Sequence, residues 1–217
     1  MKDYLNGKTV ALVGPAESIK GSKNGELIDS HDVVVRLNYA KISDPVDCGT
    51  RTDVIYYDGT HRHDLPDSEY LVCSYPKSEW FFETRSSRVA EYYSHQYGDN
   101  HRIVDDELYN SLKSGVERYN AKAGWFFSRP NTGLIAIADL LDHNIKKLFI
   151  TGIDFYRTSY IKNHPDYGET SLEDLKKVFE KGDGMDYHDI EGQFEYFKSE
   201  VIKDSRLKVD TFLSQYI

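Results

Sequence analysis

The sequence predicts a three-layer α/β/α fold built on a mostly parallel sheet. Short apolar runs rich in Val, Ile, Leu and Tyr recur along the chain, and this pattern is typical of strands buried on both faces. Longer segments with helical periodicity lie between them, and strands that alternate with helices form parallel sheets covered by helices on both sides. A chain of 217 residues has the size of one domain, so we expect residues 1–217 to form a single domain.

The first half of the chain supplies most of the predicted strands. They cover Thr9–Val13, Asp32–Leu37, Asp53–Tyr57 and Glu69–Ser74. Residues 78–97 have an aromatic-rich helical pattern, residues 102–104 form a short strand pattern, and residues 105–118 read as a helix.

The second half alternates in the same way. A helix from Thr132 to about His143 is apolar over a wide arc, which indicates burial against the sheet, and the strand Lys147–Thr151 follows it. Ser171 is the expected N-cap of the next helix. An amphipathic helix over His188–Lys203 and a strand over Leu207–Val209 close the chain, while residues 40–52 and 155–170 are the expected active-site loops.

Composition excludes several classes of partner. The net charge of −9 argues against a nucleic-acid surface and against an anionic membrane. No apolar run approaches the ~20 residues that cross a bilayer, and the N-terminus lacks the apolar core of a secretory signal, so we expect a cytoplasmic protein with no transmembrane segment. Cys48 and Cys73 are expected to be reduced thiols, neither disulfide-bonded nor zinc ligands.

Three short segments are expected to meet at one edge of the sheet. Gly14-Pro15-Ala16 and Gly152-Ile153-Asp154 each follow a strand, and Pro130-Asn131-Thr132-Gly133 begins a helix. Backbone N–H groups and the positive end of a helix suit phosphate or carboxylate, which indicates a nucleotide-linked substrate. Neither G-x-G-x-x-G nor G-x-x-x-x-G-K-[ST] is present, so dehydrogenase and P-loop chemistry are not indicated. Taken alone, the Gly14 loop also fits an ordinary strand-to-helix turn.

The order of several motifs resembles glycosyltransferase family 29, the eukaryotic-type sialyltransferases. The large sialylmotif of that family is matched in order by Lys20-Gly21-Ser22, Ile28-Asp29-Ser30-His31-Asp32, Arg36-Leu37-Asn38 and Gly49-Thr50-Arg51-Thr52. The segments at 130–133 and 152–154 resemble the small motif. His188 resembles the histidine of the very small motif, with Gln193 where the family has glutamate, and His164 loosely resembles the third motif.

The resemblance implies a Rossmann-like, variant GT-A enzyme. It would transfer sialic acid, or the related acid Kdo, from a CMP donor to a sugar hydroxyl of a glycan acceptor with inversion. It would need no metal and no cofactor beyond the CMP-sugar co-substrate. His188 would be the general base, a role that suits a histidine kept neutral at a helix N-terminus, and His164 would stabilise the leaving phosphate. The donor would contact Gly14, Pro15, Ala16, Asn38, Asn131, Thr132, Gly133, Gly152, Ile153 and Asp154.

Departures from the family pattern leave alternatives open. The family has Gly-Asn-Ser where this chain has Gly14-Pro15-Ala16, and Gln193 replaces the glutamate, so a non-catalytic CMP-sugar-binding protein of the same fold is the second reading. His61-Arg62-His63-Asp64 is expected to be a polar loop, not a metal site, and Asp154 is likewise not expected to bind metal. Trp80-Phe81-Phe82 and Trp125-Phe126-Phe127 read as core or loop anchors, with Trp125 the better candidate for stacking on a sugar.

Overall fold

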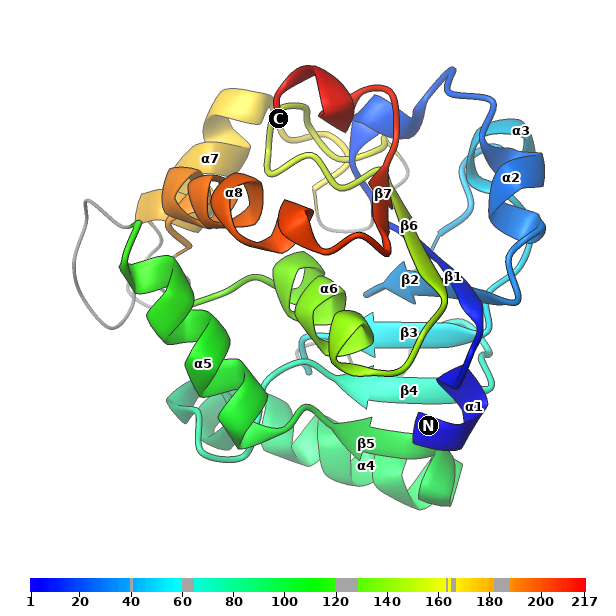
Figure 1. Cartoon of the computed structure of the whole chain (residues 1–217). Coiled ribbons are helices and arrows are strands. Elements are labelled where there is room, and N and C mark those ends of the chain that lie inside the picture. The colour runs from blue at the N-terminus through cyan, green and yellow to red at the C-terminus, as the bar shows by residue number, and fades with distance from the viewer. Residues whose placement is uncertain (40, 60–64, 120–128, 163, 165–166, 182–187) are drawn as a thin grey trace.

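The computed structural model describes residues 1–39, 41–59, 65–119, 129–162, 164, 167–181 and 188–217 (Figure 1). Seven strands form one sheet in the order β5-β4-β3-β2-β1-β6-β7, and every neighbouring pair is parallel. The strands are β1 (Thr9–Val13), β2 (Val33–Leu37), β3 (Val54–Tyr57), β4 (Tyr70–Cys73), β5 (His101–Ile103), β6 (Lys147–Thr151) and β7 (Leu207–Val209).

Both faces of the sheet are buried, as the unbroken apolar runs predict. On β1, Val10 and Leu12 pack into the larger core, whereas Ala11 and Val13 pack into a second cluster on the opposite face. This alternation follows from the two-residue period of a strand. All four side chains are nearly or fully buried, so the sheet requires a helical layer on each side.

The helices form these two layers. They are α1 (Lys2–Leu5), α2 (Gly25–Asp29), α3 (Pro45–Cys48), α4 (Ser87–Tyr97), α5 (Asp106–Glu117), α6 (Thr132–Asp142), α7 (Leu172–Lys181) and α8 (Ile190–Ser199). The apolar helix α6 contacts β3 and α5, and α5 also contacts α8 (Figure 1). Ile28 of α2 and Cys48 of α3 cover the other face of β1 and β2. The predicted α/β/α fold with a parallel sheet is confirmed.

Most predicted boundaries lie within one residue of those in the structure, and three segments differ more. The helical segment 78–97 begins with a π-helical turn, Phe82–Ser86, before α4. The helix predicted over His188–Lys203 starts at Ile190, because Asp189 caps it through the N–H of Gly192, and it ends at Ser199 before a 3₁₀ turn. Residues 40–52 are not wholly irregular, because Asp44 and Pro45 start the short helix α3.

Three further predictions concern the cysteines, the N-cap Ser171 and membrane-spanning helices. Cys48 and Cys73 are both buried free thiols. Ser171 accepts a hydrogen bond from the N–H of Asp174, as expected of an N-cap. None of the helices in the described ranges is both long and apolar enough to cross a membrane.

Candidate active site

A cavity opens at the carboxyl ends of the central strands. The strand order reverses between β1 and β6, and parallel sheets bind ligands at such a switch point. The cavity encloses roughly 1040 Å³ including the space at its mouth. It collects eleven of the twelve residues predicted for the site, namely Pro15, Ala16, Asn38, Asn131, Thr132, Gly133, Gly152, Ile153, Asp154, His164 and His188.

Gly14, the twelfth residue, does not line this cavity and borders a smaller pocket beside it. Its N–H donates to Thr151, and a Cβ atom on Gly14 would lie 2.2 Å from the carbonyl oxygen of Gly152. Gly152 itself has φ +65°. The two glycines therefore allow the loops after β1 and β6 to touch, and this contact places Pro15 and Ile153 at the cavity.

The loop after β1 and the start of α6 differ in how their backbone N–H groups are used. The N–H groups of Gly14, Ala16 and Glu17 donate to carbonyl oxygens of the neighbouring segment. These donors of the loop after β1 therefore already have acceptors within the protein. In α6, the Asn131 side chain accepts from the N–H of Leu134. Among the described residues, no group accepts from the N–H of Thr132 or Gly133, the first two residues of the helix. Unpaired N–H groups at a helix N-terminus are a geometry that can bind an anion.

His188 is held in one tautomer. Its Nδ1 lies 2.8 Å from the carbonyl oxygen of Arg129, and a carbonyl oxygen only accepts, so Nδ1 carries the proton. The ring is buried and packs beside Phe179. In the neutral ring the lone pair is therefore on Nε2, which is the arrangement that a general base requires.

His164 is held in the opposite tautomer. Its Nδ1 accepts from the N–H of Tyr167 at 3.3 Å, so the proton of the neutral ring is on Nε2. The ring stacks on Tyr160 with centroids 4.7 Å apart. One cavity thus contains a histidine with an Nε2 acceptor and a histidine with an Nε2 donor.

Asp154 organises its own loop. Its carboxylate accepts from the N–H groups of Arg157 and Thr158 and from the Thr158 hydroxyl. Burial raises the pKa of Asp154, although the hydrogen bonds from Thr158 and Arg157 partly oppose the shift. The side chain therefore shapes the turn that places Tyr156 and Tyr160 in the cavity wall.

Sequence reasoning missed one cation and an aromatic wall. Arg129 is the one lining residue with a permanent positive charge among those described; it is buried, with its guanidinium 4.2 Å from the centroid of the Phe81 ring. Arg129 directly precedes Pro130, the first residue of the predicted segment 130–133, and this position was the feature of the sequence that could have identified it. The other unpredicted lining residues are Leu37, Asp58, Tyr75, Phe81, Phe155, Tyr156, Thr158, Tyr160, Tyr167 and Phe179.

The tyrosines of this wall are hydrogen-bond donors. Burial raises the pKa of Tyr156 and of Tyr160 far above neutrality, and the neighbouring Tyr160 and Tyr167 add to these shifts. Both phenols therefore remain protonated at physiological pH. The two phenols hydrogen-bond to each other, and they line a cavity in which Arg129 supplies a positive charge.

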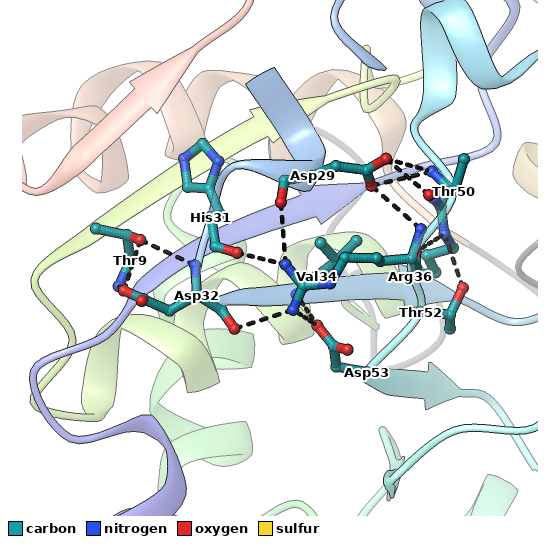
Figure 2. A network of polar contacts seen from close by, with 10 residues as sticks. Thr9, Asp29, His31, Asp32, Val34, Arg36, Thr50, Thr52 and Asp53 are labelled. Atoms are coloured by element: carbon teal, nitrogen blue, oxygen red, sulfur yellow. Dashed lines mark hydrogen bonds and ion pairs between the residues drawn. The ribbon is translucent and has the colours of Figure 1, made fainter. Parts of the chain in front are cut away.

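The charged residues of the motifs over 29–53 form a structural network (Figure 2). Asp29 accepts from Thr50 and Arg51, and the Arg51 guanidinium donates to the carbonyl oxygens of Asp29, His31 and Asp32. Thr9 pairs with Asp32 at the start of β1 and β2. This network lies at the amino ends of the strands, opposite the cavity, so most of the motif maintains the sheet and its loops.

Arg36 and Asn38 have separate roles: Arg36 belongs to the structural network, and Asn38 lines the cavity. The buried Arg36 donates to the carbonyl oxygens of Cys48 and Arg51 and to the Thr52 hydroxyl. Asn38, at φ +50°, accepts from the N–H of Asp58 through Oδ1. That bond fixes the side-chain amide of Asn38 in the cavity wall.

The structure describes only some of the residues for which a metal site or an aromatic anchor was considered. Over the ranges that the structure describes, no group of three His, Cys, Asp or Glu side chains is placed to hold a metal ion. The segments His61-Arg62-His63-Asp64 and Trp125-Phe126-Phe127 lie outside these ranges. Phe81 and Phe82 are buried core residues, as expected, and Phe81 also lines the cavity.

One family model matches the N-terminal part of the chain. The family model described as glycosyltransferase family 29 (sialyltransferase) matches residues 4–68, which contain the large motif. The resemblance to glycosyltransferase family 29 is confirmed. No curated protein sequence matches the chain.

Solved structures of sialyltransferases have the same fold. A mammalian sialyltransferase in complex with Gal-β-1-3GalNAc-ortho-nitrophenol is 17% identical with a TM-score of 0.57, covering 96% of this chain and 71% of that one. The monofunctional α-2,3-sialyltransferase Cst-I from Campylobacter jejuni has the same identity and TM-score, with coverage of 96% and 78%. A variant of the sialyltransferase CST-II in complex with CMP is 16% identical with a TM-score of 0.56, covering 95% and 84%. At these identities the likeness shows the Rossmann-like α/β fold.

Proposed function

We propose that this protein is an inverting sialyltransferase that uses a CMP-sugar donor. The observation that carries the proposal is the pair of opposite histidine tautomers in one cavity, His188 with its lone pair on Nε2 and His164 with its proton on Nε2. Transfer to a hydroxyl needs both a base for the acceptor and a donor for the leaving phosphate. The family 29 match and the CMP-bound structural relative support this class of reaction.

The donor phosphate would lie at the N-terminus of α6. The N–H groups of Thr132 and Gly133, the helix dipole and the Nε2–H of His164 would surround it. The protonated phenols of Tyr156 and Tyr160 line the same space. These donors would stabilise the charge that develops on CMP, so we propose that the reaction needs neither a metal nor a cofactor.

The acceptor hydroxyl would lie at Nε2 of His188. As its oxygen bonds to the anomeric carbon of the donor, the bond from that carbon to the CMP phosphate oxygen breaks, and the hydroxyl proton moves to Nε2. Attack opposite the leaving group inverts the anomeric centre. The Nδ1–H bond to Arg129 orients the ring and stabilises the imidazolium that forms.

The second candidate is a non-catalytic CMP-sugar-binding protein of this fold. The chain lacks the side-chain amide expected next to Gly14, and Gln193 replaces the glutamate of the resembled motif, so these two departures favour it. The positions of both histidines favour the enzyme. Kdo, in place of sialic acid, is the alternative sugar of the donor. The cytoplasmic location of the protein stays a prediction.

Binding and turnover separate these candidates. Calorimetric titration with CMP, UDP, GDP and NAD should show a clear preference for CMP. CMP-sialic acid and CMP-Kdo should then be incubated with a galactose-terminated acceptor, with CMP release and product followed by chromatography. Acceptor-dependent product from CMP-sialic acid supports the transferase, whereas CMP binding without product supports the non-catalytic protein. Preference for another nucleotide would contradict both.

A further inference from the structure

Gln193 makes two hydrogen bonds to the backbone segment that leads into α6. Its side chain is completely buried in the first turn of α8. Its Oε1 accepts from the N–H of Asn131 at 2.9 Å, and its Nε2 donates to the carbonyl oxygen of Arg129 at 3.3 Å. The same carbonyl oxygen accepts the Nδ1–H of His188. A single amide therefore joins the residue that caps α6 to the partner of His188.

We propose that Gln193 is a positioning residue, which holds the base His188 in register with the donor site at the N-terminus of α6. This inference rests on the proposed function. Asn131 caps α6 through its side chain, and its own N–H belongs to a helix terminus that has no intrahelical acceptor for it. Gln193 supplies that acceptor and, with its other end, fixes the carbonyl oxygen that sets the His188 tautomer.

The chemistry of the contact matches a neutral amide. Gln193 faces one donor, the N–H of Asn131, and one acceptor, the carbonyl oxygen of Arg129. A neutral amide matches both at any physiological pH. Methionine has a similar length and matches neither, so it would leave a buried donor unsatisfied. An ionised glutamate matches only the N–H of Asn131 and would place a negative charge against a carbonyl oxygen.

Gln193 also keeps this side of the base uncharged. A buried carboxylate that shares the Arg129 carbonyl oxygen with His188 would favour the imidazolium form. Among the residues that the structure describes, the charged groups that line the cavity with His188 are Arg129, Asp154 and Asp58. The N-cap Asp189 follows His188, and its carboxylate accepts from the N–H of Gly192. His164 and the lining tyrosines also face the cavity. Because variants of Gln193 leave all of these unchanged, differences between variants report on position 193 alone.

The test compares the wild type with Gln193→Met, Gln193→Glu and a control, Phe197→Leu. Phe197 is fully buried on the same helix, belongs to the apolar core and does not line the cavity. His188 signals in imidazole ¹⁵N and ¹³C NMR spectra, assigned from their loss in His188→Gln, report the tautomer and its titration without an activity assay. Kinetics with CMP-sialic acid give kcat, donor KM and the pH profile.

We expect Gln193→Met to lose the pure Nδ1–H tautomer and to lower kcat by about tenfold to a hundredfold, with a smaller change in donor KM. Gln193→Glu should move the acid limb of the kcat/KM profile, and the NMR titration of His188, to higher pH by about one unit or more. Phe197→Leu should lower thermal stability and leave tautomer, titration and pH profile unchanged.

Two results would overturn the inference. The first is a His188 tautomer and titration that stay at wild-type values in both Gln193 variants; the second is a Phe197→Leu protein with the same spectroscopic changes as Gln193→Met. A wild type without transferase activity would contradict the proposed function instead, and the NMR arm would still test whether Gln193 positions His188.

Discussion

The imidazole Nδ1 of His188 donates to the carbonyl oxygen of Arg129 over 2.8 Å, although the two residues are 59 positions apart in the chain. The contact joins the entry to α8 with the segment that leads into α6. It determines which ring nitrogen carries the proton and therefore which one would accept a proton in the proposed reaction. The proposed mechanism depends on this contact.

Replacing His188 by alanine should lower turnover by roughly 10²–10⁴, the usual contribution of general acid–base catalysis. Donor affinity should change little, because the base contacts the acceptor hydroxyl and not CMP. Steady-state kinetics and CMP titration measure the two quantities. His95→Ala, at an exposed position of α4, is the matched control. Near-wild-type turnover of His188→Ala would leave His188 without a catalytic role.

His164→Phe should lower kcat by about 10²–10³, as expected for the loss of one donor to a developing negative charge. Phenylalanine retains a ring that can stack on Tyr160 but removes the Nε2–H. Unlike His188→Ala, this variant should also bind CMP more weakly, because the phosphate is present in the ground state. If CMP affinity and kcat both stay unchanged, His164 only packs against Tyr160 and Tyr167.

Transferase activity should survive excess EDTA. The proposed phosphate site consists of α6 N–H groups, His164 and tyrosine hydroxyls, which need no ion to stabilise the leaving group. Rates should be measured with EDTA alone and after adding back Mg²⁺ or Mn²⁺. Activity that disappears with chelator and returns with either ion would contradict the proposed stabilisation of the leaving group.

Arg36→Lys should destabilise the fold by about 2–4 kcal/mol. The buried guanidinium satisfies two carbonyl oxygens and the Thr52 hydroxyl, and one ammonium on a flexible stem cannot reproduce this fork. Urea unfolding followed by circular dichroism measures the free energy of unfolding. Arg88→Lys, at an exposed position, is the control. Equal free energies of unfolding for the two variants would show that the hydrogen bonds of the buried Arg36 guanidinium add nothing to stability.

Acid should destabilise the protein partly through His101. Burial lowers the pKa of His101 to about 4, and its ring bonds the Tyr57 and Ser94 hydroxyls. The unfolded chain binds a proton near the ordinary histidine pKa of about 6.5, so the unfolded state takes up protons first as the pH falls. This contribution to stability is complete above about pH 6.5 and is lost progressively toward pH 4.

The measurement is Tm against pH for the wild type and His101→Gln. The variant should have a lower Tm at neutral pH if the buried hydrogen bonds matter, and its Tm should fall less between pH 6.5 and 4. Parallel curves over that interval would show that His101 titrates alike in the folded and unfolded states.

Local patterns were enough to predict the sheet and the edge at which the site lies. The run Val10-Ala11-Leu12-Val13 is apolar on both faces, and only a buried strand satisfies such a run. Asn131 before an apolar helical stretch predicts the start of α6, because N-cap chemistry is local. Since the carboxyl ends of parallel strands share one edge, the predicted loops met in one cavity.

Tertiary structure alone decided what each group does there. The tautomer of His188 depends on Arg129, and the role of Gln193 depends on Asn131, 62 positions away. Asp154, predicted to bind the donor, has its carboxylate occupied by its own turn. Proton positions and buried hydrogen bonds follow from contacts between distant segments, and no local periodicity encodes them. The sequence by itself therefore determined the fold and the place of the candidate site. Packing between α6, α8 and the described residues of the loop after β6 decided how the polar groups of that site are arranged.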